Sequence, residues 1–285
     1  MLASGIMGED AGSIRRIISC GAGAIVTKSI GLTPRDGYPN PTVVETPHGL
    51  INAMGLPNPG IHLFRAELEN LTHPHVPLIG SIFGATPEEF SSLAQKMNKY
   101  GAHAVELNLS CPHAQGYGSE IGADPENITK IVRQVKHTID IPVFVKLSPN
   151  VTDIVQLAVA AQEAHADAIV AINTVKAMAI NLETRTPVLA NKSGGYSGEA
   201  IKPIGVRCVY DISKTVKIPV IGVGGITTGE DVIEYIMAGA TAVQIGTAVY
   251  ERGVDVFTTI TKEMGKWMTQ HHVKNILDLR GVAHL

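Results

Sequence analysis

The sequence predicts a (β/α)8 TIM barrel, and three observations lead to that prediction. Short apolar runs rich in β-branched residues alternate with longer amphipathic stretches, the pattern of parallel strands joined by helices. The length of 285 residues is typical of one such barrel. Hydrophobic residues make up 45% of the chain and charged residues 17%, enough for a large buried core. We therefore expect a single domain over residues 1–285, with a doubly wound open sheet as the alternative.

Eight segments are expected to be strands, and the first of them is short. Residues 2–5 look like the tail of a strand, so either the barrel tolerates a stub there or residues upstream of Met1 complete it. The other runs are apolar throughout, as strands buried on both faces are. They are residues 24–28, 78–83, 104–109, 142–147, 168–173, 219–223 and 242–246.

Helix start signals stand between the runs. Thr86-Pro87-Glu88-Glu89 combines a capping residue, a proline at the first helical position and early acidic residues. Similar signals are Asp124-Pro125-Glu126, Thr152-Asp153 and Thr228-Gly229-Glu230-Asp231.

Two connections are too long to be plain turns, and both follow the carboxyl ends of strands. One is the insertion after the second strand, residues 31–77, and the other is the insertion after the sixth, residues 175–203. Within the latter, segments 179–182 and 187–190 alternate in polarity and are expected to pair as a hairpin. Because barrel enzymes carry their active sites at this end, both insertions are expected to roof the pocket.

Charge and cysteine usage exclude several classes of protein. A net charge of −3 without a basic run argues against nucleic acid or a membrane surface as partner. The three cysteines form no C-x-x-C pair, so no disulfide frame, zinc site or iron–sulfur cluster is expected. The histidines lack metal-ligand spacing, so no metal is expected either. This usage, with no apolar stretch of about 20 residues, predicts a cytoplasmic protein.

Polar residues end several expected strands, and Lys146 is the most informative of them. Capping of strand ends is the alternative for the asparagines. Lys146 lies inside an apolar strand, where an unpaired ammonium is costly, so we expect an anion beside it. That anion is either a carboxylate partner or a ligand. The strand-end residues are Lys28, Asn108, Lys146, Asn173 and Thr247.

Glycines cluster after the last two strands, at Gly222-Val-Gly224-Gly225 and Gly246-Thr247. In barrels these loops commonly bind a phosphate through backbone N–H groups, although plain turns also use glycine. Thr227 stands where a dinucleotide fingerprint needs its third glycine, so that interpretation is excluded. Gly194-Gly195 and Gly198 form a third such stretch.

Cys111 follows the strand that ends at Asn108 and precedes Pro112 and a glycine-rich loop. A lone cysteine is more often a small buried hydrophobe than a catalyst. A free thiol has a pKa of about 8.5, however, so a role as base is feasible here. His113 is expected to bind rather than to transfer a proton.

Together these motifs resemble those of the class 1 dihydroorotate dehydrogenases, soluble flavoproteins of pyrimidine biosynthesis. The resemblance runs from Ala3 to about Tyr250. Its motifs are Thr27-Lys-Ser29, Asn52-Ala-Met-Gly-Leu-Pro-Asn58, Glu106-Leu-Asn-Leu-Ser-Cys-Pro112, Lys146-Leu-Ser-Pro-Asn150, Ile172-Asn-Thr174, Gly194-Gly-Tyr-Ser-Gly198, Gly222-Val-Gly-Gly225 and Gly246-Thr247.

The resemblance implies a barrel that holds FMN over its carboxyl face, with dihydroorotate beside it. The residues that match flavin contacts are Ala3, Ser4, Lys28, Ser29, Asn108, Lys146, Asn173, Gly198, Gly224, Gly225, Gly246 and Thr247. Those that match substrate contacts are Lys28, Asn52, Met54, Gly55, Leu56, Asn108, His113, Asn173 and Thr174.

The resemblance also implies a mechanism. Cys111 takes the C5 proton of dihydroorotate while FMN accepts the C6 hydride, and Lys146 stabilises the negative charge that reduction brings. Class 2 membrane enzymes use serine as the base, so Cys111 indicates class 1. Closure of the loop over residues 112–122 is expected to exclude water.

Two motifs resemble those of class 1B in particular. One begins at Lys146, and the other is Ile172-Asn-Thr174. Catalytic chains of that class work with a second subunit that carries FAD and an iron–sulfur cluster and passes electrons to NAD. We expect such a partner and a homodimer, with the fumarate-using class 1A as the alternative.

Two departures from the family pattern leave alternatives open. His113 stands where the family most often has asparagine, and Cys-Pro-His also resembles dihydropyrimidine dehydrogenases, which reduce uracil and thymine. The loop at residues 52–58 favours orotate, because it matches the family's carboxylate-binding loop. The second departure is the shortened start. Outside redox chemistry, a barrel isomerase or lyase for a sugar phosphate and a binding scaffold are the remaining alternatives.

Overall fold

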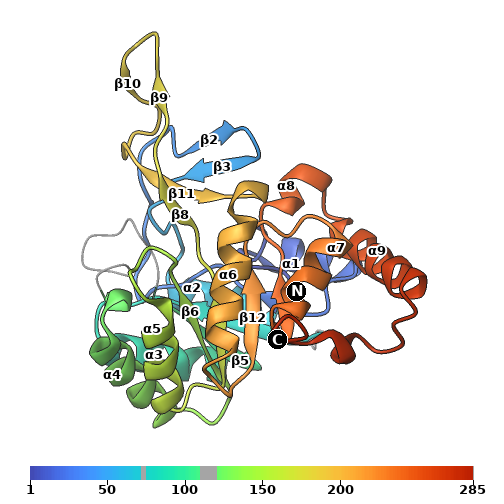
Figure 1. Cartoon of the computed structure of the whole chain (residues 1–285). Coiled ribbons are helices and arrows are strands. Elements are labelled where there is room, and N and C mark those ends of the chain that lie inside the picture. The colour runs from blue at the N-terminus through green and yellow to red at the C-terminus, as the bar shows by residue number, and fades with distance from the viewer. Residues whose placement is uncertain (72–74, 110–120, 285) are drawn as a thin grey trace.

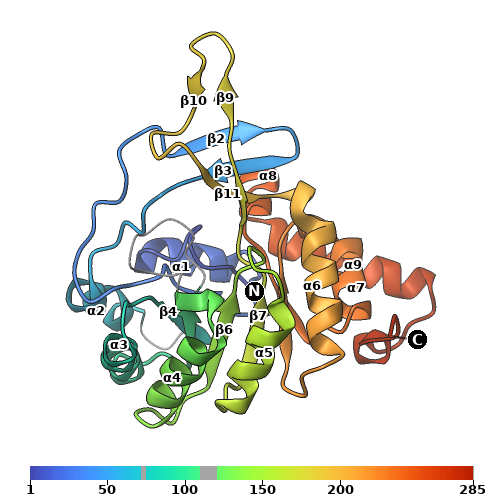
Figure 2. The ribbon, with the colours of Figure 1, turned by 60° about the vertical axis from the view of Figure 1, so that its left-hand side comes forward.

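The computed structural model of the chain describes residues 1–71, 75–109 and 121–284, and these form a barrel of parallel strands surrounded by helices (Figures 1 and 2). Seven strands follow one another in the order β1-β4-β5-β6-β7-β12-β13, and all neighbours are parallel. Their bounds are β1 Ile25–Val26, β4 Leu78–Ile82, β5 Ala104–Asn108, β6 Val143–Leu147, β7 Ala168–Ala171, β12 Val220–Val223 and β13 Ala242–Gln244.

Leu2 closes the barrel between the first and last of these strands. It forms parallel bridges with Ile25 and with Ile245. Its backbone N–H donates to the Ala24 carbonyl at 3.0 Å, and its own carbonyl accepts from the Val26 N–H at 3.1 Å. The short first strand is therefore a stub that still joins both neighbours. The barrel prediction is confirmed, and the open-sheet alternative is wrong.

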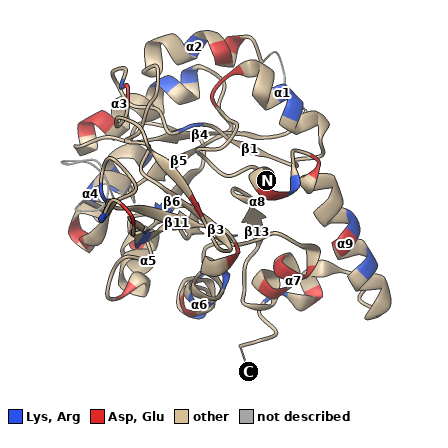
Figure 3. Ribbon diagram, turned by 90° about the horizontal axis from the view of Figure 1, so that it is seen from above, with Lys and Arg blue, Asp and Glu red and all other residues tan. Residues whose placement is uncertain are grey.

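The helices form a ring outside the strands, and charged residues lie mostly on this ring (Figure 3). The longer helices begin where the sequence predicts. Thr86 accepts from the Glu89 N–H to cap α3, and Asp124 and Asp153 cap α4 and α5. The helices are α1 Ala11–Ser19, α2 Ile61–Glu69, α3 Pro87–Lys99, α4 Pro125–Lys136, α5 Ile154–Glu163, α6 Lys202–Ser213, α7 Gly229–Met237, α8 Ala248–Arg252 and α9 Val256–Gln270, with 3-10 turns at η1 Ile121–Ala123, η2 Glu199–Ile201 and η3 Ile276–Leu279.

The strand side chains divide between the two sides of the barrel wall. Residues such as Ile169 and Val220 face the helices and belong to the largest apolar cluster. Val170 and Ile221, one position further along each strand, belong to a smaller cluster that includes Phe144. Because alternate residues of a strand point to opposite faces, this smaller cluster fills the barrel interior. Burial on both faces accounts for the uninterrupted apolar runs.

The two long insertions meet in a second sheet. β2 (Val43–Thr46) and β3 (Gly49–Asn52) come from one insertion, and β8 (Val175–Ala177) and β11 (Gly194–Ser197) come from the other. They pair antiparallel in the order β2-β3-β11-β8. The expected hairpin forms between β9 (Ile180–Asn181) and β10 (Thr186–Pro187), and it projects beyond this sheet (Figure 1).

Candidate active site

A cavity of about 490 Å³ lies between the carboxyl ends of the barrel strands and the four-stranded sheet. Every described residue that the sequence assigned to FMN or dihydroorotate lines this cavity, and the roles given to these residues remain predictions. Cys111 and His113 lie outside the described residues. The lining residues predicted from sequence are Ala3, Ser4, Lys28, Ser29, Asn52, Met54, Gly55, Leu56, Asn108, Lys146, Asn173, Thr174, Gly198, Gly224, Gly225, Gly246 and Thr247.

Lys146 stands on the barrel floor of this cavity and has a carboxylate partner. Its Nζ lies 3.6 Å from Oε1 of Glu106 and donates to Oε1 of Gln244 at 3.4 Å. The Lys146 side chain is 7% exposed and that of Glu106 is fully buried. Of the two anions that the sequence left open, the structure therefore supplies the carboxylate partner, and the cavity leaves room for a ligand as well.

The sequence did not lead us to predict Glu106 and Gln244 as site residues, although their positions in the strands indicate it. Glu106 precedes Asn108 by two positions in an apolar strand, so both side chains point into the barrel. Gln244 occupies the same kind of position in β13 and is fully buried. A polar residue two positions before a predicted site residue in a strand faces the same side of the sheet, and when buried it needs a hydrogen-bond partner there.

Ser29 is the centre of a hydroxyl cluster on the cavity wall. Asn108 Nδ2 donates to Ser29 Oγ at 3.0 Å. The Ser29 hydroxyl also lies 2.8 Å from that of Ser81 and 3.2 Å from that of Ser4. Because these side chains come from segments far apart in the sequence, the hydrogen bonds help to fix the orientation of the Asn108 amide on the cavity wall.

Lys28 forms an ion pair that the sequence did not reveal. Its Nζ lies 3.0 Å from Oε1 of Glu9, a residue that also lines the cavity. The side chains are 8% and 59% exposed, respectively. Because the Glu9 side chain is exposed to water, which can solvate its carboxylate, an incoming carboxylate can exchange with Glu9 at Lys28.

The loop that follows β3 is held in a fixed shape by Asn58. Asn58 is buried, its Nδ2 donates to the Leu56 carbonyl at 2.9 Å, and its Oδ1 accepts from the Gly60 N–H at 2.9 Å. Gly55 and Leu56 have φ values of 76° and 59°, in the left-handed region. The backbone of this loop therefore meets the cavity in a preformed conformation.

The glycine loop after β12 is closely packed against η2 and the start of α6. Gly224 and Gly225 have φ values of 123° and 66°. A Cβ on Gly225 would lie 2.7 Å from the Lys202 backbone nitrogen, and one on Gly224 would lie 3.3 Å from Ile201 Cδ1. Gly225 is thus required for both conformation and space, whereas Gly224 is favoured chiefly by its positive φ, and both residues line the cavity.

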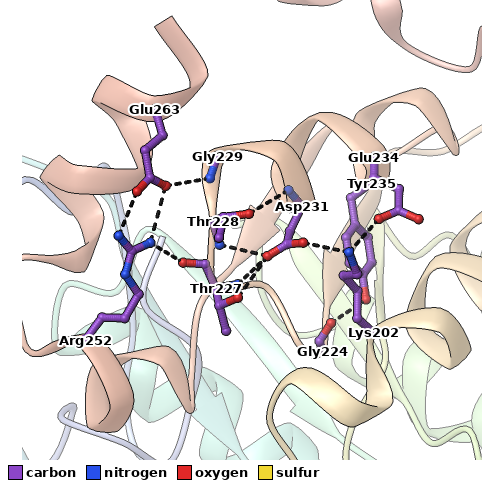
Figure 4. A network of polar contacts seen from close by, with 10 residues as sticks. All are labelled: Lys202, Gly224, Thr227, Thr228, Gly229, Asp231, Glu234, Tyr235, Arg252 and Glu263. Carbon is purple, nitrogen blue, oxygen red and sulfur yellow. Dashed lines mark hydrogen bonds and ion pairs between the residues drawn. The ribbon is translucent and has the colours of Figure 1, made fainter. Parts of the chain in front are cut away.

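Asp231 fixes the end of this loop from the first turn of α7 (Figure 4). Its Oδ2 accepts from the backbone N–H groups of Thr227 at 2.9 Å and Thr228 at 2.7 Å. Lys202 Nζ donates to Asp231 Oδ1 at 2.7 Å and pairs with Glu234 at 2.9 Å. Burial would raise the pKa of the Asp231 carboxyl, but these hydrogen bonds outweigh burial and hold that pKa below its ordinary value.

A second ion pair holds the same loop from the other side (Figure 4). Arg252 Nη1 donates to the Thr227 carbonyl at 2.5 Å, and its Nη2 lies 2.6 Å from Oε1 of Glu263. Glu263 Oε2 accepts from the Gly229 N–H at 2.8 Å. The sequence showed Thr228 and Asp231 only as a helix start, whereas the structure shows that this start is tied into a network beside the cavity.

Fold and cavity together define a (β/α)8-barrel protein with its binding site at the carboxyl ends of the strands, the arrangement of barrel enzymes. No helix in the described part of the chain is long and apolar enough to cross a membrane. The chain belongs to the dihydroorotate dehydrogenase family, because the family model described as Dihydroorotate dehydrogenase matches residues 1–268. The family predicted from the motifs is therefore confirmed.

Relatives of known name support the same assignment. The protein named dihydroorotate dehydrogenase B (NAD(+)), catalytic subunit, of Methanocella arvoryzae is 51% identical over 284 residues, which cover 100% of this chain and 93% of that protein. The protein of the same name from Pyrococcus horikoshii is 53% identical over 283 residues, which cover 99% and 93%. These names agree with the class 1B interpretation.

A solved structure confirms the fold independently. The structure described as DHODH in complex with ferulenol, from Eimeria tenella, matches with a TM-score of 0.86 at 23% identity. The match covers 99% of this chain and 84% of that chain. At such an identity the likeness shows the fold alone.

Proposed function

We propose that this chain oxidises dihydroorotate to orotate in pyrimidine biosynthesis, as the FMN-binding catalytic subunit of an NAD-linked dihydroorotate dehydrogenase. One observation carries the proposal. The described residues that match the family's flavin and substrate contacts all line one cavity, in a chain about half identical to proteins named as such subunits. The word "subunit" in those names supports a partner chain for electron transfer, and a homodimer remains part of the proposal.

The residues around the cavity fit FMN. The volume of about 490 Å³ is within the range of cofactor sites. Gly224, Gly225 and Gly246 line it with backbone, and backbone N–H groups are suited to a phosphate. Lys146 adds a buried cation of the kind that suits the electron-rich edge of a reduced flavin. When bound, FMN would supply the hydride acceptor.

The remaining chemistry belongs to the side chains. Lys28 and the backbone of the loop 52–56 would hold the substrate carboxylate, with Glu9 released to solvent. Asn108, held by its hydrogen bond to Ser29, would orient the pyrimidine ring from the cavity wall. Cys111 would remove the C5 proton as a thiolate, a step in which a positioned base contributes roughly 10²–10⁴ in rate.

A substrate comparison tests this function. The FMN-loaded protein is mixed anaerobically with dihydroorotate or with dihydrouracil, and the loss of flavin absorbance is followed. We expect rapid bleaching by dihydroorotate only. Bleaching by dihydrouracil alone would favour the dihydropyrimidine alternative that His113 raised. A protein that cannot be loaded with FMN would contradict the redox assignment altogether.

A further inference from the structure

Three polar side chains from three strands form a closed ring inside the barrel. Gln244 Nε2 donates to Glu106 Oε2 at 2.6 Å, and Gln244 Oε1 accepts from Lys146 Nζ at 3.4 Å. Lys146 Nζ lies 3.6 Å from Glu106 Oε1, which completes the ring. Glu106 and Gln244 are fully buried and Lys146 is 6% exposed, so solvent screens these contacts little.

Donor and acceptor counts show why the third member must be a carboxylate. An ammonium only donates, so both groups that face Lys146 must present oxygen. The NH2 group of Gln244 then faces residue 106, so the side chain of residue 106 must accept a hydrogen bond from Gln244 as well. An amide at residue 106 would bring its own NH2 against either Lys146 or Gln244. Only an acceptor-only side chain, the ionised form of Glu106, satisfies every contact.

Glu106 acts on Lys146 chiefly through charge. Among the described residues, its Oε1 has no hydrogen-bond partner, and its contact is the ion pair with Lys146. Lys146 Nζ donates one hydrogen bond to Gln244 and has the Glu106 carboxylate on the same side, while its side chain also lines the cavity. The Lys146 ammonium is thus held in place, and the Glu106 carboxylate offsets part of its charge.

We propose that Glu106 is a positioning residue that, together with Gln244, fixes Lys146 at the cavity and would lower the reduction potential of FMN bound there by offsetting the Lys146 charge. The inference rests on the proposed function, because it requires FMN in this cavity. Reduction adds negative charge to the flavin edge that a nearby cation favours. Removal of the Glu106 charge therefore leaves a stronger net cation and favours the reduced flavin.

The test is the FMN midpoint potential of three variants, measured on the FMN-loaded chain by equilibration with redox dyes. Glu106→Gln should bind reduced FMN at least tenfold more tightly relative to oxidised FMN, which corresponds to about 30 mV in the positive direction for a two-electron couple. Glu106→Asp keeps the charge but withdraws it from Lys146, so it should shift the potential in the same direction by less. Should the glutamine variant not fold, the aspartate variant still decides.

The matched control is Asp167→Asn. Asp167 also pairs with a lysine, Lys136 at 2.8 Å, but it precedes β7 at the amino end of the barrel. Asp167→Asn removes the same formal charge as Glu106→Gln, but far from the cavity. If the charge of Glu106 acts locally on the flavin, Asp167→Asn should leave the FMN midpoint potential unchanged.

The outcomes separate this inference from the proposed function. A positive shift in the Glu106 variants alone supports the inference. An unchanged or more negative potential in these variants overturns it, as does an equal shift in Asp167→Asn, even if the wild type is reduced by dihydroorotate. Failure of the wild type to bind FMN would instead contradict the proposed function.

Discussion

Replacement of Asp231 by asparagine tests whether the network around the glycine loop holds it in shape. Oδ2 of Asp231 accepts hydrogen bonds from the backbone N–H groups of Thr227 and Thr228, and Oδ1 accepts one from Lys202 Nζ. The asparagine can turn its single oxygen toward the loop and keep those two bonds. Its NH2 group then faces the Lys202 ammonium, so the variant loses one charge-assisted hydrogen bond and gains a contact between donors.

The expected cost follows from the burial of this pair. A hydrogen bond to a charged group contributes about 1.5–3 kcal/mol. Lys202 is 27% exposed and Asp231 10%, so partial screening favours a value of about 2 kcal/mol. Glu234→Gln is the matched control, because Glu234 contacts the same ammonium but is 48% exposed. Its loss should cost no more than about 1 kcal/mol.

Thermal and urea unfolding of the FMN-free proteins at neutral pH give the comparison. At about 2–4 °C per kcal/mol, Asp231→Asn should lower the midpoint by about 4–8 °C, and Glu234→Gln by less. Asp231→Asn should also weaken FMN binding, because its loop is less well ordered before the phosphate arrives. Equal costs for the two variants would refute the reasoning, since burial would then not distinguish them.

Three further predictions concern acid stability, the glycine loop and the base. Because the folded state lowers the Asp231 pKa below its ordinary 3.8, its stabilisation is complete above about pH 4 and is lost as the pH falls through the lowered value. Urea unfolding between pH 5 and 2 should therefore show a steeper loss of stability for the wild type than for Asp231→Asn. Gly225→Ala should lower the free energy of unfolding and the FMN affinity more than Gly253→Ala does. Both positions have positive φ, but only at Gly225 would Cβ lie 2.7 Å from the Lys202 backbone nitrogen. Similar losses in the two variants would mean that backbone strain alone sets the cost. Cys111→Ser should keep FMN bound but slow flavin reduction by dihydroorotate by about 10²-fold or more near neutral pH, as stopped-flow absorbance would measure, and an unchanged rate would remove the thiol from the mechanism.

Much of the fold was predictable because its signals are local. Apolar runs gave the strands, and residues such as Thr86 and Asp153 gave the helix starts, since a cap bonds to backbone only two or three positions away. Even the stub at Leu2 was visible as a short apolar tail. The sequence did not show that Leu2 pairs with Ile25 on one side and with Ile245 on the other, and so closes the barrel.

The site was predictable where a residue type carries its own meaning. Lys146 indicated a buried cation, and Gly224 and Gly225 indicated a glycine loop suited to a phosphate, to which the structure adds their positive φ. The partners of these residues were hidden because they are distant in sequence. Gln244 lies 98 positions from Lys146, and the contact exists only once the barrel has closed.

The ion pair between Lys28 and Glu9 was hidden for a different reason. An exposed acidic residue near the start of the chain resembles any solvated surface charge. Only the fold shows that Glu9 lies at the rim of the cavity, against the lysine expected to hold the substrate.

Formation of orotate in a single anaerobic turnover tests the central claim most directly. The FMN-loaded chain is mixed with excess dihydroorotate without an electron acceptor, and the orotate released is measured against the flavin reduced. We predict equal amounts of orotate and reduced flavin. Absence of orotate, or flavin that stays oxidised, would contradict the assignment of this cavity to dihydroorotate oxidation.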